Sequence, residues 1–264
     1  MTRWIQLDGA VNTRDMGGLL TTGGDTVGHG LLLRSDNLQE LTAKDVGTLV
    51  SEIGVRHVID LRSDIEVDLE GPGPLTREPA VRTHRLSLFA EGGGLTDVDA
   101  DSTTGVDTDK ILPWQDRPDQ GGHESERSVS HYLGYLAARP DSVVAALRVI
   151  AQGPSIVNCA AGKDRTGVVI ALALHVVRVP RDTIVADYAA TGERLEAILA
   201  RLRASTTYAQ DLDSRPADSH MPHAYTMEKF LTILDERHDG PVGWLERHGW
   251  TGDDTTALRS ALLR

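Results

Sequence analysis

The sequence predicts an α/β fold in which a central, mostly parallel sheet is flanked by helices and followed by a helical C-terminal part. Short apolar runs alternate with helical stretches over residues 1–88, and this strand–helix order is typical of parallel sheets covered by helices. The short apolar run "SIVN" (155–158) stands shortly before a long apolar helical run, 166–179. From residue 181 onward only amphipathic helical patterns follow.

The first region contains the expected strands. "GLLLRSD" (30–36) is predicted to be a strand, and "LTAKDVGTLVSEIG" (41–54) a helix in which Thr42 is a candidate N-cap. "VRHVIDLRS" (55–63) is predicted to be the second strand, and 80–88 a further one.

Helical periodicity prevails after residue 128. The absence of an internal repeat or a clean linker favours one domain over residues 1–264. The expected helices cover 128–140, 141–153, 166–179, 181–205, 224–240, 243–249 and 253–263.

An acidic, glycine-rich segment, 91–127, separates these two regions. It holds ten acidic residues, three basic residues and six glycines, and loops of this length are commonly lids or disordered. Its Asp97-x-Asp99-x-Asp101 spacing resembles a calcium loop, but glycine and glutamate are missing from the sixth and twelfth positions. We expect an insertion that acts as a solvated loop or lid and filters substrates, and we expect no metal.

Composition excludes several classes of partner. The net charge is −12 and aromatic residues make up 4% of the chain, which argues against nucleic acid as a partner. No apolar run is long enough for a membrane span, and the N-terminus lacks the apolar core of a signal peptide. The single cysteine cannot form an internal disulfide, so we expect a cytoplasmic protein, although secretion without a classical signal is compatible with these features.

The single cysteine, Cys159, stands between a predicted strand and a predicted helix that begins near Thr166. A helix N-terminus presents unpaired N–H groups and the positive end of the helix dipole, and thiols placed there become good nucleophiles. Arg165 follows at Cys-x5-Arg spacing, so its planar guanidinium can hold an anion that the loop amides surround. The nucleotide-binding pattern fails, because Asp164 follows Lys163 and no glycine stands five residues before Gly162.

With these residues in view, "CAAGKDRTG" resembles the signature of the cysteine-dependent protein-tyrosine-phosphatase superfamily. It is most similar to the bacterial tyrosine/serine phosphatase-like branch, whose loop reads HCxAGKDRTG. The similarity spans nearly the whole chain, with the acidic segment as the main variable insertion. The other matching segments are "NTRDMGG" (12–18), "LLLRSDNLQELT" (31–42), "VIDLRSDIE" (58–66), "VADYAATGERL" (185–195) and "GWLERHGWTGDDTTALRSALL" (243–263).

The resemblance implies roles for the loop residues. Cys159 attacks phosphorus and forms a phosphocysteine, while Arg165 stabilises the equatorial oxygens. Thr166 donates a hydrogen bond to the sulfur, caps the helix, or does both. The remaining phosphate-binding residues implied are Ala160, Ala161, Gly162, Lys163 and Gly167.

The general acid has two candidates. In this branch the loop aspartate, Asp164, is the usual one, and Asp60 at the end of a predicted strand ranks second. Other polar and charged residues of the matching segments could support the loop, and the charged ones could instead form only structural ion pairs. They are Asn12, Arg14, Asp15, Arg34, Asp36 and Arg62.

Asn158 departs from the family pattern, which has histidine before the cysteine. Asparagine offers donors and an acceptor but never a positive charge. It would preserve the loop geometry while stabilising the thiolate less.

The resulting functional prediction is a cofactor-independent phosphomonoester hydrolase. Its expected substrates are phosphotyrosine or phosphoserine proteins, or a small phosphorylated metabolite. A non-catalytic phosphate-binding module is the alternative. Sulfur transfer normally uses a different loop, and arsenate reduction generally recruits further cysteines, which this chain lacks.

Overall fold

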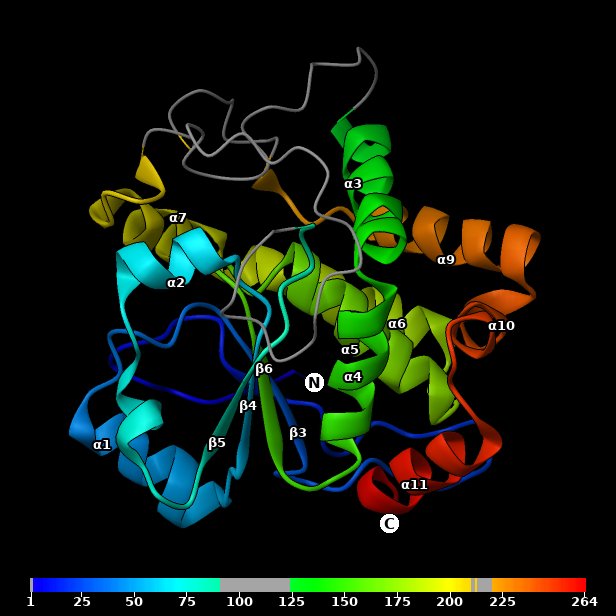
Figure 1. Ribbon diagram of the computed structural model, residues 1–264, viewed down its shortest axis with the longest axis horizontal. Helices are drawn as coiled ribbons and strands as arrows, with labels where there is room; N and C mark the ends of the chain where they lie inside the picture. Colours follow the sequence, from blue (N-terminus) through cyan, green and yellow to red (C-terminus); the bar gives the residue numbers. More distant parts are fainter. Residues whose placement is uncertain (1, 91–123, 210–211, 213–219) are drawn as a thin grey trace.

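The computed structural model describes residues 2–90, 124–209, 212 and 220–264 (Figure 1). In these residues six strands form one sheet in the order β1-β2-β3-β6-β4-β5. The four strands from β3 to β5 are parallel, and β1 and β2 add an antiparallel edge, so the predicted mostly parallel sheet is confirmed. The strands are β1 (Arg3–Trp4), β2 (Arg14–Asp15), β3 (Leu32–Ser35), β4 (His57–Asp60), β5 (Arg82–Arg85) and β6 (Ser155–Asn158).

Helices cover both faces of this sheet (Figure 1). The α-helices are α1 (Ala43–Gly47), α2 (Asp64–Glu70), α3 (Glu124–Ala138), α4 (Pro140–Ile150), α5 (Asp164–Val176), α6 (Arg181–Ala190), α7 (Leu195–Ala204), α9 (Ala224–His238), α10 (Gly240–Arg247) and α11 (Gly252–Leu262). A π-helical segment, η1 (Thr48–Ile53), extends α1, and 3₁₀ turns occur at η2 (Pro74–Arg77) and η3 (Thr191–Arg194).

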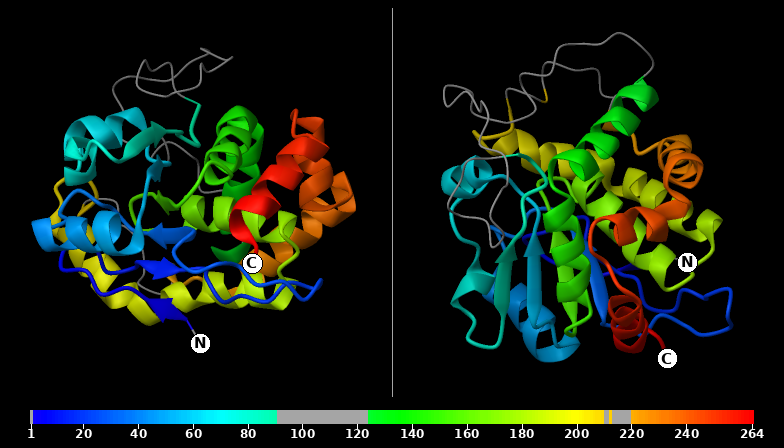
Figure 2. Two further views of the ribbon diagram at one scale, coloured as in Figure 1. Left: turned by 90° about the horizontal axis from the view of Figure 1, so that it is seen from below. Right: turned by 45° about the vertical axis from the view of Figure 1, so that its right-hand side comes forward.

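The sheet separates two apolar clusters because successive side chains of a strand point to opposite faces. Leu33 and Ile156 belong to the cluster on the side of α1 and η1. Leu32 and Val157 belong to the larger cluster, which includes most of α5. The helices α3, α4, α6, α9 and α10 gather on this α5 side, as Figure 2 shows from two further directions. Thus β6 and α5 lie at the centre of the molecule, one directly before and one directly after the cysteine loop.

Two elements differ from the sequence expectation. The helix expected over 181–205 is divided into α6 and α7 by η3, where Gly192 weakens the helix and the hydroxyl of Thr191 accepts a hydrogen bond from Arg14. The strand expected over 55–63 ends at Asp60, because a Ser63–Glu66 capping box starts α2 there. By contrast, the predicted N-cap at Thr42 is confirmed, with a capping box to Asp45.

Most of the acidic segment, 91–123, lies outside the described residues, so its predicted role as a lid stays a prediction. Residues 124–127, which were expected to belong to the loop, begin α3 instead. Within the described chain, none of the helices has the length and apolar character needed to cross a membrane.

Candidate active site

The Cys-x5-Arg loop connects the carboxyl end of β6 to the first turn of α5. Because β6 lies between two parallel neighbours, β3 and β4, the loop sits at the crevice where open α/β sheets bind ligands. A cavity of about 160 Å³ opens at this point. Six of the predicted catalytic and phosphate-binding residues line it: Cys159, Ala160, Ala161, Lys163, Asp164 and Arg165.

The first turn of α5 begins earlier than expected. The helix starts at Asp164 with Lys163 as its N-cap residue, so the reading of Thr166 as an N-cap is wrong. Thr166 instead occupies the first turn, fully buried, and its hydroxyl has no hydrogen-bond partner among the described residues. This hydroxyl is therefore available to a group that enters the loop.

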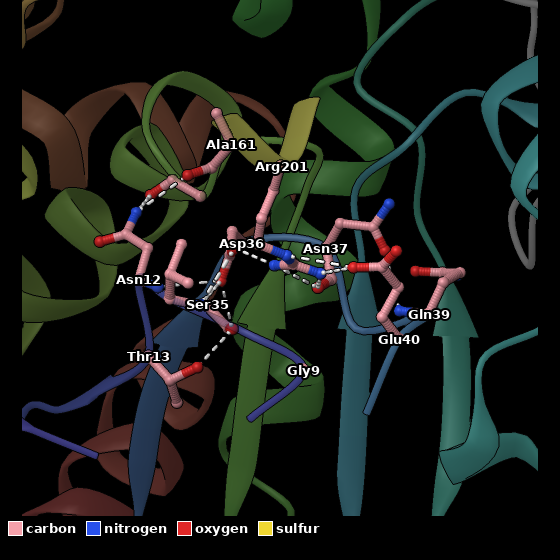
Figure 3. A network of polar contacts seen from close by, with 12 residues as sticks. Gly9, Asn12, Thr13, Ser35, Asp36, Asn37, Gln39, Glu40, Ala161 and Arg201 are labelled. Carbon is pink, nitrogen blue, oxygen red and sulfur yellow. Dashed lines mark hydrogen bonds and ion pairs between the residues drawn. The ribbon is translucent and has the colours of Figure 1, made fainter. Parts of the chain in front are cut away.

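Side chains outside the cysteine loop donate hydrogen bonds to its carbonyl groups. The Asn12 amide donates to the carbonyls of Ala161 (2.9 Å) and Gly162 (3.2 Å), and Arg34 donates to that of Gly162 at 2.6 Å (Figure 3 shows Asn12 and Ala161). In a trans peptide the N–H points opposite to the C=O. The N–H groups of Gly162 and Lys163 are thereby directed away from Asn12 and Arg34, which fits a set of donors that face an anion.

One carboxylate, Asp187 on α6, orients the two arginines behind the loop. It accepts hydrogen bonds from Arg14 (2.8 Å) and Arg34 (2.5 Å), and Arg14 in turn binds the Asn12 side chain at 2.6 Å. Burial would raise the pKa of Asp187, but the charges of both arginines hold it below its usual value. Burial and the nearby charge of Arg34 lower the pKa of Arg14 to about 10. Sequence reasoning missed Asp187, although it stands in the matching segment 185–195.

Asp36 fixes the backbone beside Asn12 (Figure 3). Its carboxylate accepts hydrogen bonds from the backbone N–H groups of Val11 (3.1 Å) and Asn12 (3.0 Å) and pairs with Arg201 on α7. Burial raises the pKa of Asp36, and these partners counteract it in part. Arg201 also pairs with Glu40 at 3.0 Å, so α7 is attached to the elements that support the loop.

Arg165 is held by a buried carboxylate that sequence reasoning did not single out. Its Nη1 and Nη2 donate to the two oxygens of Glu66 at 2.5 and 2.9 Å, and Glu66 is fully buried in α2. Burial alone would lower the pKa of Arg165, but the charge and hydrogen bonds of Glu66 raise it well above its usual value. The hydroxyl of Tyr208 donates to Glu66 at 3.1 Å, and the Arg165 guanidinium lies over the ring of Phe89, 5.1 Å from its centroid.

The second acid candidate, Asp60, lies outside the residues that line this cavity. Arg62 binds both its oxygens, at 2.9 and 2.6 Å, and Asn158 donates to it at 3.4 Å. Burial would raise the pKa of Asp60, but the charge and hydrogen bonds of Arg62 hold it below the usual value. Asp60, Arg62 and Asn158 thus form a hydrogen-bonded cluster at the ends of β4 and β6. Asp15 accepts hydrogen bonds from the backbone N–H groups of Gly17 and Gly30.

Asp164 lines the cavity itself, with one third of its side chain exposed. The hydroxyl of Tyr132 donates to its Oδ1 at 2.5 Å. The Lys163 ammonium lies 3.6 Å from its Oδ2 and donates to the carbonyl of His220 at 2.9 Å. Among the described residues, no group of three or more His, Cys, Asp or Glu side chains is arranged to hold a metal ion.

Fold and loop together define a phosphatase, and the comparison with known families agrees. The chain belongs to the tyrosine phosphatase family, whose model matches residues 5–264. The resemblance to the bacterial branch is thereby confirmed, and so is the prediction of a phosphatase enzyme.

Three bacterial relatives are similar to this chain. The "Triple specificity protein phosphatase PtpB" of Mycobacterium tuberculosis is 33% identical over 98% of both chains. A "Tyrosine-protein phosphatase" of Nostoc commune is 30% identical over 62% of this chain and 49% of its own length. A "Putative tyrosine-protein phosphatase" of Cupriavidus necator is 29% identical over 72% of this chain and 63% of its own length.

Substitution of Gly162 tests the geometry of the loop. Gly162 has φ +66°, and an added Cβ would lie 2.4 Å from the carbonyl oxygen of Ser35. We expect Gly162→Ala to lower kcat/KM about a hundredfold, because small displacements of positioning groups cost that much. Strain in the left-handed region would also destabilise the fold by ~1–3 kcal/mol. Gly47→Ala, where a Cβ meets open space in α1, is the control and should leave activity unchanged in the same assay. Full activity of Gly162→Ala would contradict this geometry.

Substitution of Glu66 tests the buried pair. Glu66→Gln leaves the Arg165 charge without its carboxylate, so we expect the free energy of unfolding to fall by ~3–5 kcal/mol in urea titrations. Vanadate or phosphate should also bind more weakly, because Arg165 loses its fixed orientation. The control is Glu52→Gln at an exposed position. Unchanged stability and anion affinity in Glu66→Gln would show that the pair does not orient Arg165.

Proposed function

We propose that this phosphatase hydrolyses phosphomonoesters through a phosphocysteine on Cys159. The observation that carries the proposal is the position of the thiol: at the mouth of a helix N-terminus, in one cavity with Arg165 and Asp164. A helix N-terminus binds anions, and thiols at such positions are good nucleophiles. No cofactor is needed for this chemistry.

In the first step the Cys159 thiolate attacks phosphorus, and the bond from phosphorus to the leaving oxygen breaks. Asp164 donates its proton to that oxygen, while Arg165 and the loop N–H groups stabilise the charge on the equatorial oxygens. Ala160, Ala161, Gly162 and Lys163 supply the surrounding loop, and Thr166 lies in the first turn of α5. The N–H of Gly167 donates to the carbonyl of Lys163 at 2.9 Å, so Gly167 belongs to the helix and is not one of the loop donors. The fixed orientation of these donors supports the proposal, because preorganised donors need no rearrangement in the transition state.

In the second step water attacks the phosphocysteine. Asp164, now a carboxylate, takes a proton from the water, and the sulfur leaves as thiolate with free phosphate as the product. The buried hydroxyl of Thr166, which has no hydrogen-bond partner among the described residues, would donate a hydrogen bond to the departing sulfur. This role replaces the helix cap as the function of Thr166.

The walls of the cavity support phosphotyrosine proteins as substrates. Aromatic and aliphatic side chains surround the approach to Cys159, and such walls hold an aryl ring. They include Phe89, Tyr135, Leu199, Leu202 and Tyr208. The name of the Mycobacterium tuberculosis relative, a triple specificity phosphatase, supports a range that includes phosphoserine or small phosphate esters.

Replacement of Cys159 tests the intermediate. Cys159→Ser should abolish turnover of p-nitrophenyl phosphate, since the hydroxyl is a poor nucleophile at neutral pH. It should still bind phosphate with near wild-type affinity in calorimetry, because Arg165 and the amides remain. Rapid quenching of the wild-type enzyme should trap phosphate on Cys159. Full activity of Cys159→Ser would contradict the proposed mechanism. A wild-type protein that binds phosphate but turns over no substrate would favour a non-catalytic module.

A leaving-group series separates the two acid candidates. Loss of the general acid slows substrates with basic leaving groups most, because these need the proton. We expect Asp164→Asn to lower kcat/KM for phenyl phosphate by about 10²–10³ and to affect dinitrophenyl phosphate much less. Asp60→Asn, the matched variant, should change both substrates by the same factor. The reverse pattern would assign the acid to Asp60.

A further inference from the structure

We propose that Tyr132 is a positioning residue that assigns the catalytic proton to one oxygen of Asp164. The inference rests on the proposed role of Asp164 as general acid and deepens it. Tyr132 comes from α3 and Asp164 from the first turn of α5, two helices in contact beside the cysteine cavity.

The ring of Tyr132 is fixed in place by aromatic packing. It is fully buried and meets the rings of Tyr188 and Phe230 edge-on, at centroid distances of 6.2 and 5.8 Å. Tyr135 stacks on it at 6.1 Å. Because a ring packed on several sides cannot change rotamer freely, the position of its hydroxyl is determined by the core.

The hydrogen bonds have a definite direction. The Tyr132 hydroxyl donates to Asp164 Oδ1, 2.5 Å away, and this oxygen accepts both in the ionised carboxylate and in an acid protonated at Oδ2. The Tyr132 oxygen then accepts from the Tyr188 hydroxyl at 2.7 Å. Burial, with the charge of Asp164, raises the pKa of Tyr132 well above its usual value, so Tyr132 stays a donor at neutral pH.

These hydrogen bonds occupy Oδ1, so the proton is carried by Oδ2, which lies 3.6 Å from the Lys163 ammonium. When the Oδ2–H bond breaks and the leaving oxygen takes the proton, the electron pair stays on the Asp164 carboxylate. The hydrogen bond from Tyr132 strengthens as that charge develops, because charge-assisted hydrogen bonds are the stronger ones. Tyr132 therefore stabilises the transition state of proton donation rather than the bound substrate.

Helix α6 connects the hydrogen bonds between Tyr188, Tyr132 and Asp164 to the arginines behind the cysteine loop. Tyr188 follows directly after Asp187, which binds the two arginines behind the loop. The ring of Tyr188 lies 3.0 Å from the place where a Cβ of Gly167 would stand. Gly167 thus lets α5 approach Tyr188 closely enough for the hydrogen bonds from Tyr188 through Tyr132 to Asp164 to form. This close approach gives a structural reason for a glycine at that position.

The test is Tyr132→Phe, measured with a series of aryl phosphates whose leaving groups differ in basicity. We expect kcat/KM for phenyl phosphate to fall about tenfold, because transition-state stabilisation is lost. For dinitrophenyl phosphate we expect kcat/KM to stay near the wild-type value. Tyr188→Phe should change the series in the same direction by a smaller factor. Tyr225→Phe removes the same atom from an exposed tyrosine in α9 and should change nothing.

The outcomes separate the inference from the proposed function. If Tyr132→Phe and Tyr188→Phe slow every substrate equally, or none, while Asp164→Asn steepens the leaving-group dependence, the positioning role is overturned and the acid stands. If Asp164→Asn itself leaves the dependence unchanged, both are overturned. Should Tyr132→Phe fail to fold, Tyr188→Phe decides alone: a steeper dependence supports the positioning role, and an unchanged one overturns it.

Discussion

The site depends above all on the hydrogen bonds that Asn12 and Arg34 donate to the carbonyls of the cysteine loop. A loop of small residues has no preferred shape of its own, so its amides converge on an anion only if the carbonyls are held from the other side. Arg34 is a buried cation, and a buried cation needs a carboxylate. Asp187 meets this need for Arg34 and Arg14 together, and thereby places α6 against the back of the loop.

A second carboxylate, Glu66, pairs with the buried Arg165, which lines the cavity. Arg165 must stay charged and keep one orientation although it is buried, and the two oxygens of Glu66 satisfy both requirements. Glu66 also caps α2, and its contact with Tyr208 connects it to the chain that follows α7. The arrangement therefore fixes the guanidinium before any phosphate arrives, which reduces the entropy lost on binding.

The sequence predicted those parts of the site that are contiguous. Cys159 directly follows β6 and Arg165 lies in the first turn of α5, so the spacing and the flanking strand and helix patterns suffice to place them. Glu66 is 99 residues from Arg165, and Asp187 is 173 residues from Arg14. Which distant carboxylate meets which arginine depends on tertiary packing, which periodicity does not encode. The same reason explains the break between α6 and α7, where Arg14 binds the hydroxyl of Thr191.

Asn158 stands where the family loop has histidine, and the contacts around it explain why an uncharged residue fits there. Its side chain is buried beside Asp60, and the charge of Asp60 is balanced by Arg62 rather than by residue 158. A neutral amide next to the cysteine therefore leaves no carboxylate without a partner. The positive potential at Cys159 comes from Arg165 and from the N-terminus of α5. None of the hydrogen bonds described above joins Asn158 to either of them. Under the proposed mechanism, the charge of a histidine at this position is thus not required for the anion site.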